Sequence, residues 1–199
     1  GYGNAGSIAA RLISDLGAKV IAVSDSGGGI QNPAGLDLAA VDEHKKKTGS
    51  VFGLAGATAV SNQAILEIPC DVLIPAALEN QITAENAAKI KTKIVAEAAN
   101  GPTTPEADEI LFANGAMVIP DILCNAGGVV VSYFEWVQDL QSFFWGETEI
   151  TDKLFRILEN AFTQTLHLSR KQKISMRMAA LSLGVTRVRE AKKLRGLFP

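Results

Sequence analysis

The first six residues carry three glycines and an amide at a spacing that can bind phosphate. Residues 1–6 read GYGNAG, which fits the G-x-G-x-x-G pattern of turns that let the backbone approach a pyrophosphate. The N–H groups at the start of a following helix would bind its negative charge. Asp25 stands 19 residues after Gly6, close to the ~20 at which the ribose-binding acid of such folds occurs. The spacing predicts a dinucleotide site; the alternative is a glycine-rich turn without a ligand.

A helix and a strand must position this motif. Apolar residues recur at helical spacing after it, and Gly17 stands where a helix C-terminal cap would. Residues 19–24 (KVIAVS) form a β-branched run that ends at Asp25 and predicts a strand. In folds of this type a buried strand also precedes the glycines. Because the sequence starts at the first glycine, we expect it to be truncated, with the first strand of the sheet missing.

The following residues alternate short apolar runs with helical patterns. Residues 70–77, 93–99 and 116–120 predict strands, and residues 36–47, 83–90 and 104–113 predict helices. Thr104 followed by Pro105 is a strong helix start, because Thr caps a helix and Pro suits its first position. Residues 50–60 receive no clear assignment. The alternation predicts an α/β fold with a Rossmann-like doubly wound sheet.

The pattern changes after residue 125, where no further strand is predicted. Long helices are expected over residues 127–144, along the apolar stripe of residues 150–166, and over residues 176–194 with Ser175 as the cap. We therefore divide the chain into a dinucleotide-binding domain, residues 1–145, and a C-terminal helical segment, residues 146–199. The helical segment is expected to pack back toward whatever precedes residue 1.

Composition excludes several other classes of protein. The 199 residues hold 19 Lys plus Arg against 21 Asp plus Glu, and such a balance argues against binding to nucleic acid. No apolar stretch approaches the ~20 residues that span a bilayer, so no membrane association is expected. Cys70 and Cys124 cannot form a disulfide framework and lack the paired spacing of a zinc site, so no metal is expected. We expect a cytoplasmic protein.

Longer blocks are more specific than the glycine motif. They are PAALEN at 75–80, AEAANGPTTPEAD at 96–108, IPDILCNAGGV at 119–129 and SYFEW at 132–136, together with SDSGGGI at 24–30. With the opening turn, they resemble the cofactor-binding half of the glutamate dehydrogenase family, which includes leucine, phenylalanine and valine dehydrogenases. The resemblance implies reversible oxidative deamination of L-glutamate to 2-oxoglutarate and ammonia with NAD, in a hexamer.

The same resemblance assigns roles residue by residue. It implies cofactor contacts from residues of the glycine turn and of the strand ends: Gly1, Gly3, Asn4, Ala5, Gly6, Asp25, Ser26, Ala76, Ala77, Asn80, Gln81, Asn100 and Asn125. Val129 and Ser132, three residues apart on one helix face, are implied to meet the substrate, with the serine hydroxyl donating to the distal carboxylate of glutamate. The catalytic lysines and acid of the family lie on a preceding substrate domain. No catalytic residue is therefore assigned here, and this chain alone is expected to be inactive.

Several alternatives stay open at this stage. Asn100 before Gly101 could only shape a turn, and Ser132 could only bond its own helix backbone. Asp25 would repel a 2′-phosphate, which favours NAD, but NADP stays open, and residues 45–47 (KKK) read either as a solvated helix end or as a phosphate contact. The competing functions are a leucine, phenylalanine or valine dehydrogenase and a non-catalytic nucleotide-binding module.

Overall fold

The computed structural model describes residues 1–196 in two compact units, which meet between Ala116 and Met117 in the sequence. Residues 197–199, the end of the predicted helical segment, lie outside the described residues. The functional division that we predict after residue 145 stays a prediction. Each unit is described by itself below.

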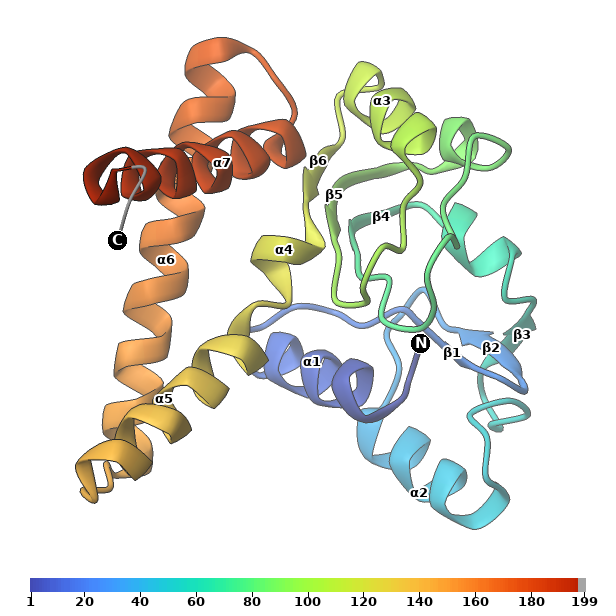
Figure 1. Ribbon diagram of the computed structural model, residues 1–199. Helices are drawn as coiled ribbons and strands as arrows, with labels where there is room; N and C mark the ends of the chain where they lie inside the picture. Colours follow the sequence, from blue (N-terminus) through green and yellow to red (C-terminus); the bar gives the residue numbers. More distant parts are fainter. Residues whose placement is uncertain (197–199) are drawn as a thin grey trace. The chain divides into compact units, whose positions relative to one another are not determined.

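The first unit opens with a helix and a small antiparallel sheet (Figure 1). Helix α1 is followed by strands β1 and β2, and the third strand comes later in the chain: α1 Asn4–Asp15, β1 Ala22–Asp25, β2 Gly28–Gln31 and β3 Thr58–Val60. The strand order is β1-β2-β3, and Asp25 pairs with Gly28 across a tight turn. Strand β1 covers only the end of the predicted 19–24 run, while the carbonyls of Val20 and Ile21 accept from the amides of Leu36 and Asn32 beyond β2.

The parallel part of the fold follows. Strands β4, Cys70–Leu73, and β5, Thr92–Ala96, pair in parallel with Cys70 opposite Thr92. The connecting and flanking helices are α2 Leu38–Thr48, η1 Ala64–Glu67, η2 Ala87–Lys89 and α3 Pro105–Ala113. This confirms the α/β prediction. The carboxyl ends of β4 and β5 lie at one edge of the pair, where ligands bind in open α/β sheets.

Two helix starts in this unit are capped by side chains. The carboxylate of Asp37 accepts hydrogen bonds from the amides of Ala39 and Ala40 at the start of α2. The hydroxyl of Thr104 accepts from the amide of Ala107, as the sequence predicts for α3. Both caps satisfy amides that a helix cannot pair internally.

The predicted helix over residues 83–90 is wrong. Only a short 3-10 turn, Ala87–Lys89, forms there. The side chain of Asn86 accepts from the amide of Thr83 at 2.9 Å and donates to the carbonyl of Gln81 at 2.8 Å. Polar side chains that bond the local backbone in this way compete with a helix. Ile82 is also fully buried and bridges to Thr103 in an extended conformation.

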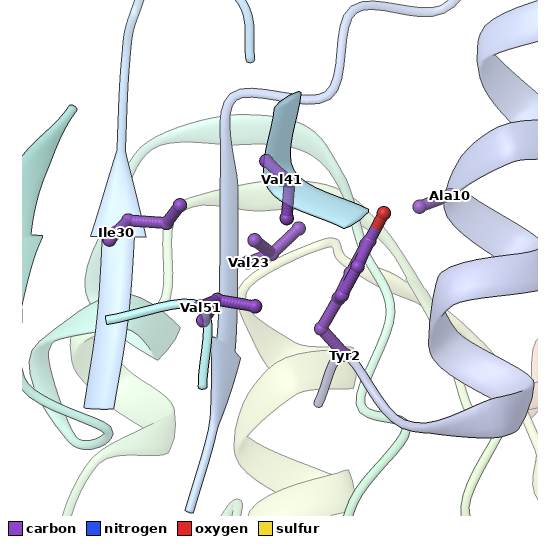
Figure 2. Close-up of a cluster of buried hydrophobic side chains, with 6 residues drawn as sticks. All are labelled: Tyr2, Ala10, Val23, Ile30, Val41 and Val51. Atoms are coloured by element: carbon purple, nitrogen blue, oxygen red, sulfur yellow. The ribbon is translucent and has the colours of Figure 1, made fainter. Parts of the chain in front are cut away.

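A cluster of buried apolar side chains joins the glycine turn to the first sheet. Figure 2 shows its members: Tyr2, Ala10, Val23, Ile30, Val41 and Val51. The ring of Tyr2 is 2 % exposed and packs among residues from α1, β1 and α2. Burial of an aromatic ring of this size is worth roughly 2 kcal/mol. The backbone of the glycine turn is thereby anchored to the core.

The second unit is mainly helical. It holds β6 Met117–Ile119, α4 Asp121–Cys124, α5 Gly127–Gln141, α6 Glu147–Gln172 and α7 Met176–Arg195. The hydroxyl of Ser175 accepts from the amide of Met178, so the predicted cap of the last helix is confirmed. Helix α5 ends at Gln141, earlier than the predicted 144, because Ser142 adopts a left-handed conformation. The Gln138 side chain then accepts from the amide of Trp145 at 2.6 Å and holds the turn.

No helix within residues 1–196 has the length and apolar character that a bilayer crossing requires.

Candidate functional site

The first turn of α1 presents unpaired amides beside open space. Gly3 is the N-cap, and no side chain caps this end of the helix, in contrast to α2 and α3. The amide of Ser7 bonds the carbonyl of Gly3 at 2.9 Å, so the amides before Ser7 precede the first helical hydrogen bond. A Cβ placed on Gly3 would meet no atom of residues 1–196 within 4 Å. The positive end of the helix can therefore accept an anion that comes close to the backbone.

The other two glycines of the motif are required by close packing. A Cβ on Gly6 would overlap the main-chain oxygen of Gly1 and lie 3.4 Å from the Cβ of Ala76. A Cβ on Gly1 would lie 2.7 Å from the Cβ of Ala77 and 3.0 Å from the carbonyl oxygen of Ala76. The structure thus brings together four residues of the predicted site, Gly1, Gly6, Ala76 and Ala77. The glycine turn lies against the segment that follows β4.

The segment after β5 lies beside the segment after β4. The carbonyl of Pro75 accepts from the amides of Ala98 and Ala99 at 3.0 and 2.9 Å. Farther along, the amide of Asn80 donates to the carbonyl of Gly101, and the amide of Gln81 donates to that of Pro102. Asn80, Gln81 and Asn100 therefore occupy two neighbouring loops beyond the ends of the parallel strands. Their contacts with a cofactor stay predictions.

The carboxylate of Asp25, at the end of β1, is fully engaged inside the protein. One oxygen accepts from the amide of Gly27 at 2.9 Å and the hydroxyl of Ser50 at 2.7 Å. The other oxygen accepts from the amide of Val51 at 2.7 Å and lies 3.4 Å from the ammonium of Lys45. The three hydrogen bonds and this ion pair occupy most of the lone-pair sites of the carboxylate, and the side chain is only 9 % exposed. A direct bond to a ribose hydroxyl would have to displace one of them.

The ionisation of Asp25 reflects these partners. Burial by itself would raise the pKa of the carboxyl, but the hydrogen bonds from Ser50, Val51 and Gly27, together with the charge of Lys45, hold the pKa below its ordinary value. In the same corner, burial and the hydrogen bond donated to Asp42 raise the pKa of the Tyr2 phenol well above its ordinary value. The hydroxyl of Tyr2 lies 2.8 Å from Asp42. Asp25 is therefore charged and Tyr2 neutral near neutral pH.

The surroundings of Lys45 differ from the solvated helix end that the sequence predicts for residues 45–47. Its ammonium donates to the main-chain oxygen of Tyr2 at 2.5 Å, faces Asp25, and lies 5.8 Å from the centre of the Tyr2 ring. Lys45 is therefore not a solvated helix end, although its neighbour Lys47 is exposed and pairs with Glu43. The charge of Asp25, on which the expected preference for NAD rests, is paired with that of Lys45. The spacing in the sequence could indicate that Lys45 faces inward, since it lies four residues after the buried Val41 and shares its helix face.

An open cavity of about 430 Å³ lies next to the β1–β2 turn. Its lining includes Ser26, which the sequence predicts, and residues that sequence reasoning missed: Gly27, Gly28, Phe52, Ala59, Val60, Ser61 and Asn62. The side-chain amide of Asn62 donates to the carbonyl of Asp25 at 3.0 Å. This volume falls within the range of small-molecule sites. The missed residues come mostly from or near the region, residues 50–60, that had no assignment.

The second unit contains the remaining predicted site residues. Asn125 is the C-cap of α4, and α5 begins two residues later. Val129 and Ser132 are both exposed on α5, with Val129 74 % exposed. The side chain of Asp121 accepts from the amide of Ile122 at 2.8 Å and pairs with Arg177 of α7 at 3.4 Å. This pair fixes the start of the helix that ends at Asn125.

Relatives of known name align with almost the whole of this chain. The chain is 52 % identical over 200 residues to the glutamate dehydrogenase of Thermotoga maritima, a match that covers 100 % of this chain and 48 % of that protein. It is 48 % identical over 196 residues to the NAD-specific glutamate dehydrogenase of Staphylococcus aureus strain COL, covering 98 % of this chain and 47 % of that protein. The chain spans about half the length of these curated relatives.

Solved structures give the same result. The hetero-hexameric glutamate dehydrogenase from Thermus thermophilus, in its Leu bound form, matches with a TM-score of 0.91 and 34 % identity, over 100 % of this chain and 47 % of that one. The glutamate dehydrogenase from Peptoniphilus asaccharolyticus matches with a TM-score of 0.81 and 33 % identity, over 99 % and 46 % of the two chains. The sequence profile of the Glutamate/Leucine/Phenylalanine/Valine dehydrogenase family matches residues 1–196. This chain belongs to that family.

Proposed function

We propose that this chain binds NAD and supplies the cofactor-binding part of an enzyme that interconverts L-glutamate with 2-oxoglutarate and ammonia. The observation that carries the proposal is the uncapped start of α1 with open space at Gly3, within a chain of this family. The choice of glutamate and NAD is supported by relatives named glutamate dehydrogenase and NAD-specific glutamate dehydrogenase.

In this proposal the first unit holds the cofactor. The amides of Asn4 and Ala5 bind the pyrophosphate, because they open α1 and precede its first internal hydrogen bond. Ser26 borders the adenosine ribose at the cavity beside the β1–β2 turn. The side chains of Asn80, Gln81 and Asn100 contact the cofactor from the loops that follow the parallel strands. NAD, when bound, supplies the acceptor for the hydride that leaves the α-carbon of glutamate.

Asn125, Val129 and Ser132 are the residues of the second unit that this proposal uses. Asn125 contacts the nicotinamide half, since a side-chain amide both donates to and accepts from a ribose or carboxamide. Val129 packs against the substrate side chain, and the hydroxyl of Ser132 donates to the distal carboxylate of glutamate. Both side chains are exposed on α5, which leaves them accessible to a ligand. The chain's task is to orient the α-carbon for hydride transfer and to exclude water.

Replacement of Ser132 by Ala tests whether the substrate is glutamate or an apolar amino acid. For a glutamate enzyme, loss of one charge-assisted hydrogen bond of about 1.5–3 kcal/mol raises the KM for glutamate roughly tenfold or more. Val131→Ala on the same helix is the matched control. Unchanged kinetics with glutamate, or higher activity with leucine, phenylalanine or valine, would favour the alternative substrates.

We also propose a hexamer located in the cytoplasm. A hetero-hexameric glutamate dehydrogenase is among the solved structures that this chain matches over its full length. Two free cysteines, Cys70 and Cys124, are consistent with a reducing compartment. Light scattering of the protein as its gene encodes it tests the assembly; a monomer or dimer at assay concentration would contradict it.

The proposed function as a whole is tested by binding and turnover of the protein as its gene encodes it. NADH is titrated by fluorescence, and NAD reduction is followed with glutamate, leucine, phenylalanine and valine. The proposal expects saturable NADH binding and the highest kcat/KM with glutamate. Failure to bind either NADH or NADPH would overturn the cofactor assignment, and binding without turnover of any amino acid would support a non-catalytic nucleotide-binding module.

A further inference from the structure

A single lysine joins the glycine turn to the acid at the end of β1. The ammonium of Lys45 donates to the main-chain oxygen of Tyr2 and lies 3.4 Å from the carboxylate of Asp25. The lysine side chain is 30 % exposed and the aspartate side chain 9 %. At such burial an ion pair is less screened than a surface pair. The contact between Lys45 and Asp25 is therefore a stable feature of this part of the first unit.

The hydrogen bonds of Asp25 limit how it can act on a ligand. All three of its hydrogen-bond donors belong to the protein, two of them, the amides of Gly27 and Val51, being main-chain groups, and its ion-pair partner is Lys45. The acid can therefore act on a bound nucleotide mainly through its charge. That charge is bonded to the amide of Gly27, within the turn Ser26–Gly28 that lines the cavity of about 430 Å³.

Charge pairing changes the repulsion that a phosphate would meet there. A lone carboxylate repels a 2′-phosphate with an energy that falls only as the inverse of distance. With an ammonium 3.4 Å away, the pair acts as a dipole, and its field at the cavity falls faster with distance. Asp25 therefore discriminates less strongly against NADP.

We propose that Lys45 is a specificity-determining residue: by neutralising Asp25, it reduces the discrimination against a 2′-phosphate at the adenosine end of the cofactor site. The proposal rests on the proposed function, since it presumes that the cavity beside Ser26 receives the adenosine ribose. Lys45 acts through Asp25 and through the Tyr2 carbonyl rather than by contact with the cofactor.

The test compares the dissociation constants of NADH and NADPH, measured by fluorescence titration at low and fixed ionic strength. Lys45→Met removes the charge but keeps the length of the side chain, and the exposed Lys46→Met in the same helical turn is the matched control. We expect Lys45→Met to increase the NADPH-to-NADH ratio of dissociation constants on the order of tenfold, since an uncompensated charge near a protein surface is worth about this much. Lys46→Met leaves the ratio within about twofold.

Two further variants test whether Lys45 acts through its charge. Asp25→Asn leaves Lys45 unpaired, so the ratio should shift toward tighter NADPH binding. The double variant Asp25→Asn/Lys45→Met should return the ratio close to that of the unmodified protein, because both charges are gone. High salt should reduce each of these shifts. A residue that only supports the fold would change both affinities together and would not show this cancellation.

The outcomes separate the inference from the proposed function. Equal loss of NADH and NADPH affinity in Lys45→Met, with an unchanged ratio, overturns the inference, and so does a double variant that keeps the altered ratio. If Lys45→Met does not fold, as judged by circular dichroism, Asp25→Asn alone decides through the direction of its shift. If the unmodified protein binds neither nucleotide, the proposed function fails, and the inference fails with it.

Discussion

Two glycines of the opening turn should respond differently to the same substitution. Gly6→Ala places a methyl group on the main-chain oxygen of Gly1 and only 3.0 Å from its carbonyl carbon. Because the obstacle is backbone, the turn or the helix must move, and we expect a cost of about 3 kcal/mol. Gly3→Ala meets no atom of the described residues within 4 Å and costs only the weaker N-cap preference of Ala, about 0.5–1 kcal/mol.

The two variants separate folding from ligand binding. The Tm measured by circular dichroism should fall by about 9 °C for Gly6→Ala and by about 1.5–3 °C for Gly3→Ala, since 1 kcal/mol shifts Tm by about 3 °C at this chain length. Gly3→Ala should nevertheless lower NADH affinity about 30-fold, because its methyl group occupies the space proposed for the pyrophosphate and overlap costs about 2 kcal/mol. Gly146→Ala, at the N-cap of α6 and likewise without an obstructing atom among residues 1–196, controls for loss of an N-cap glycine. A Gly3→Ala protein that binds NADH as tightly as the unmodified protein would refute this reasoning.

Two further predictions concern stability. Thr104→Ala removes the cap of α3 and should lower the free energy of unfolding by about 1 kcal/mol. Urea denaturation measures this change, with Thr83→Ala as a control. An unchanged midpoint would contradict a stabilising role of the cap. The pKa of Asp25 is lowered in the folded protein, so its stabilisation is present above the ordinary pKa of a carboxyl and is lost as pH falls through the folded pKa. The Tm difference between the unmodified protein and Asp25→Asn should therefore be largest near neutral pH and shrink below about pH 4; a difference independent of pH would contradict it.

The elements set by local chemistry could be predicted from the sequence. Thr104 and Ser175 each start a helix by bonding an amide three residues on, and both caps are present. The parallel pair of β4 and β5 follows from two short apolar runs separated by a connection. Such signals lie within a few residues of the structure they determine, so a single sequence carries them.

The elements that depend on distant partners could not be predicted. Strand β3 forms because Val60 pairs with Gly29, far back in the chain, and nothing in residues 50–60 alone indicates this. The antiparallel direction of β1 and β2 depends on the tight turn at Gly28, which adopts a positive φ of 135°. The pattern of residues 83–90 predicts a helix, because periodicity does not show the bonds of Asn86 to its local backbone.

The candidate site also combines features that the sequence predicts with features that it does not. The glycine turn and the loops after the strands follow from motif and topology, and the structure brings Gly1 and Gly6 against Ala76 and Ala77. The state of Asp25 could not be predicted, because its donors Ser50 and Val51 lie about 25 residues away. The role of Lys45 depends on the same long-range contact.

The central claim is that a dinucleotide pyrophosphate binds at the uncapped start of α1. A crystal structure of the protein with NADH tests this most directly. The account predicts phosphate oxygens within about 3 Å of the amide nitrogens of Asn4 and Ala5, with the backbone of Gly3 against the pyrophosphate. Density for the pyrophosphate elsewhere, with the amides of α1 bonded only to water, would contradict it.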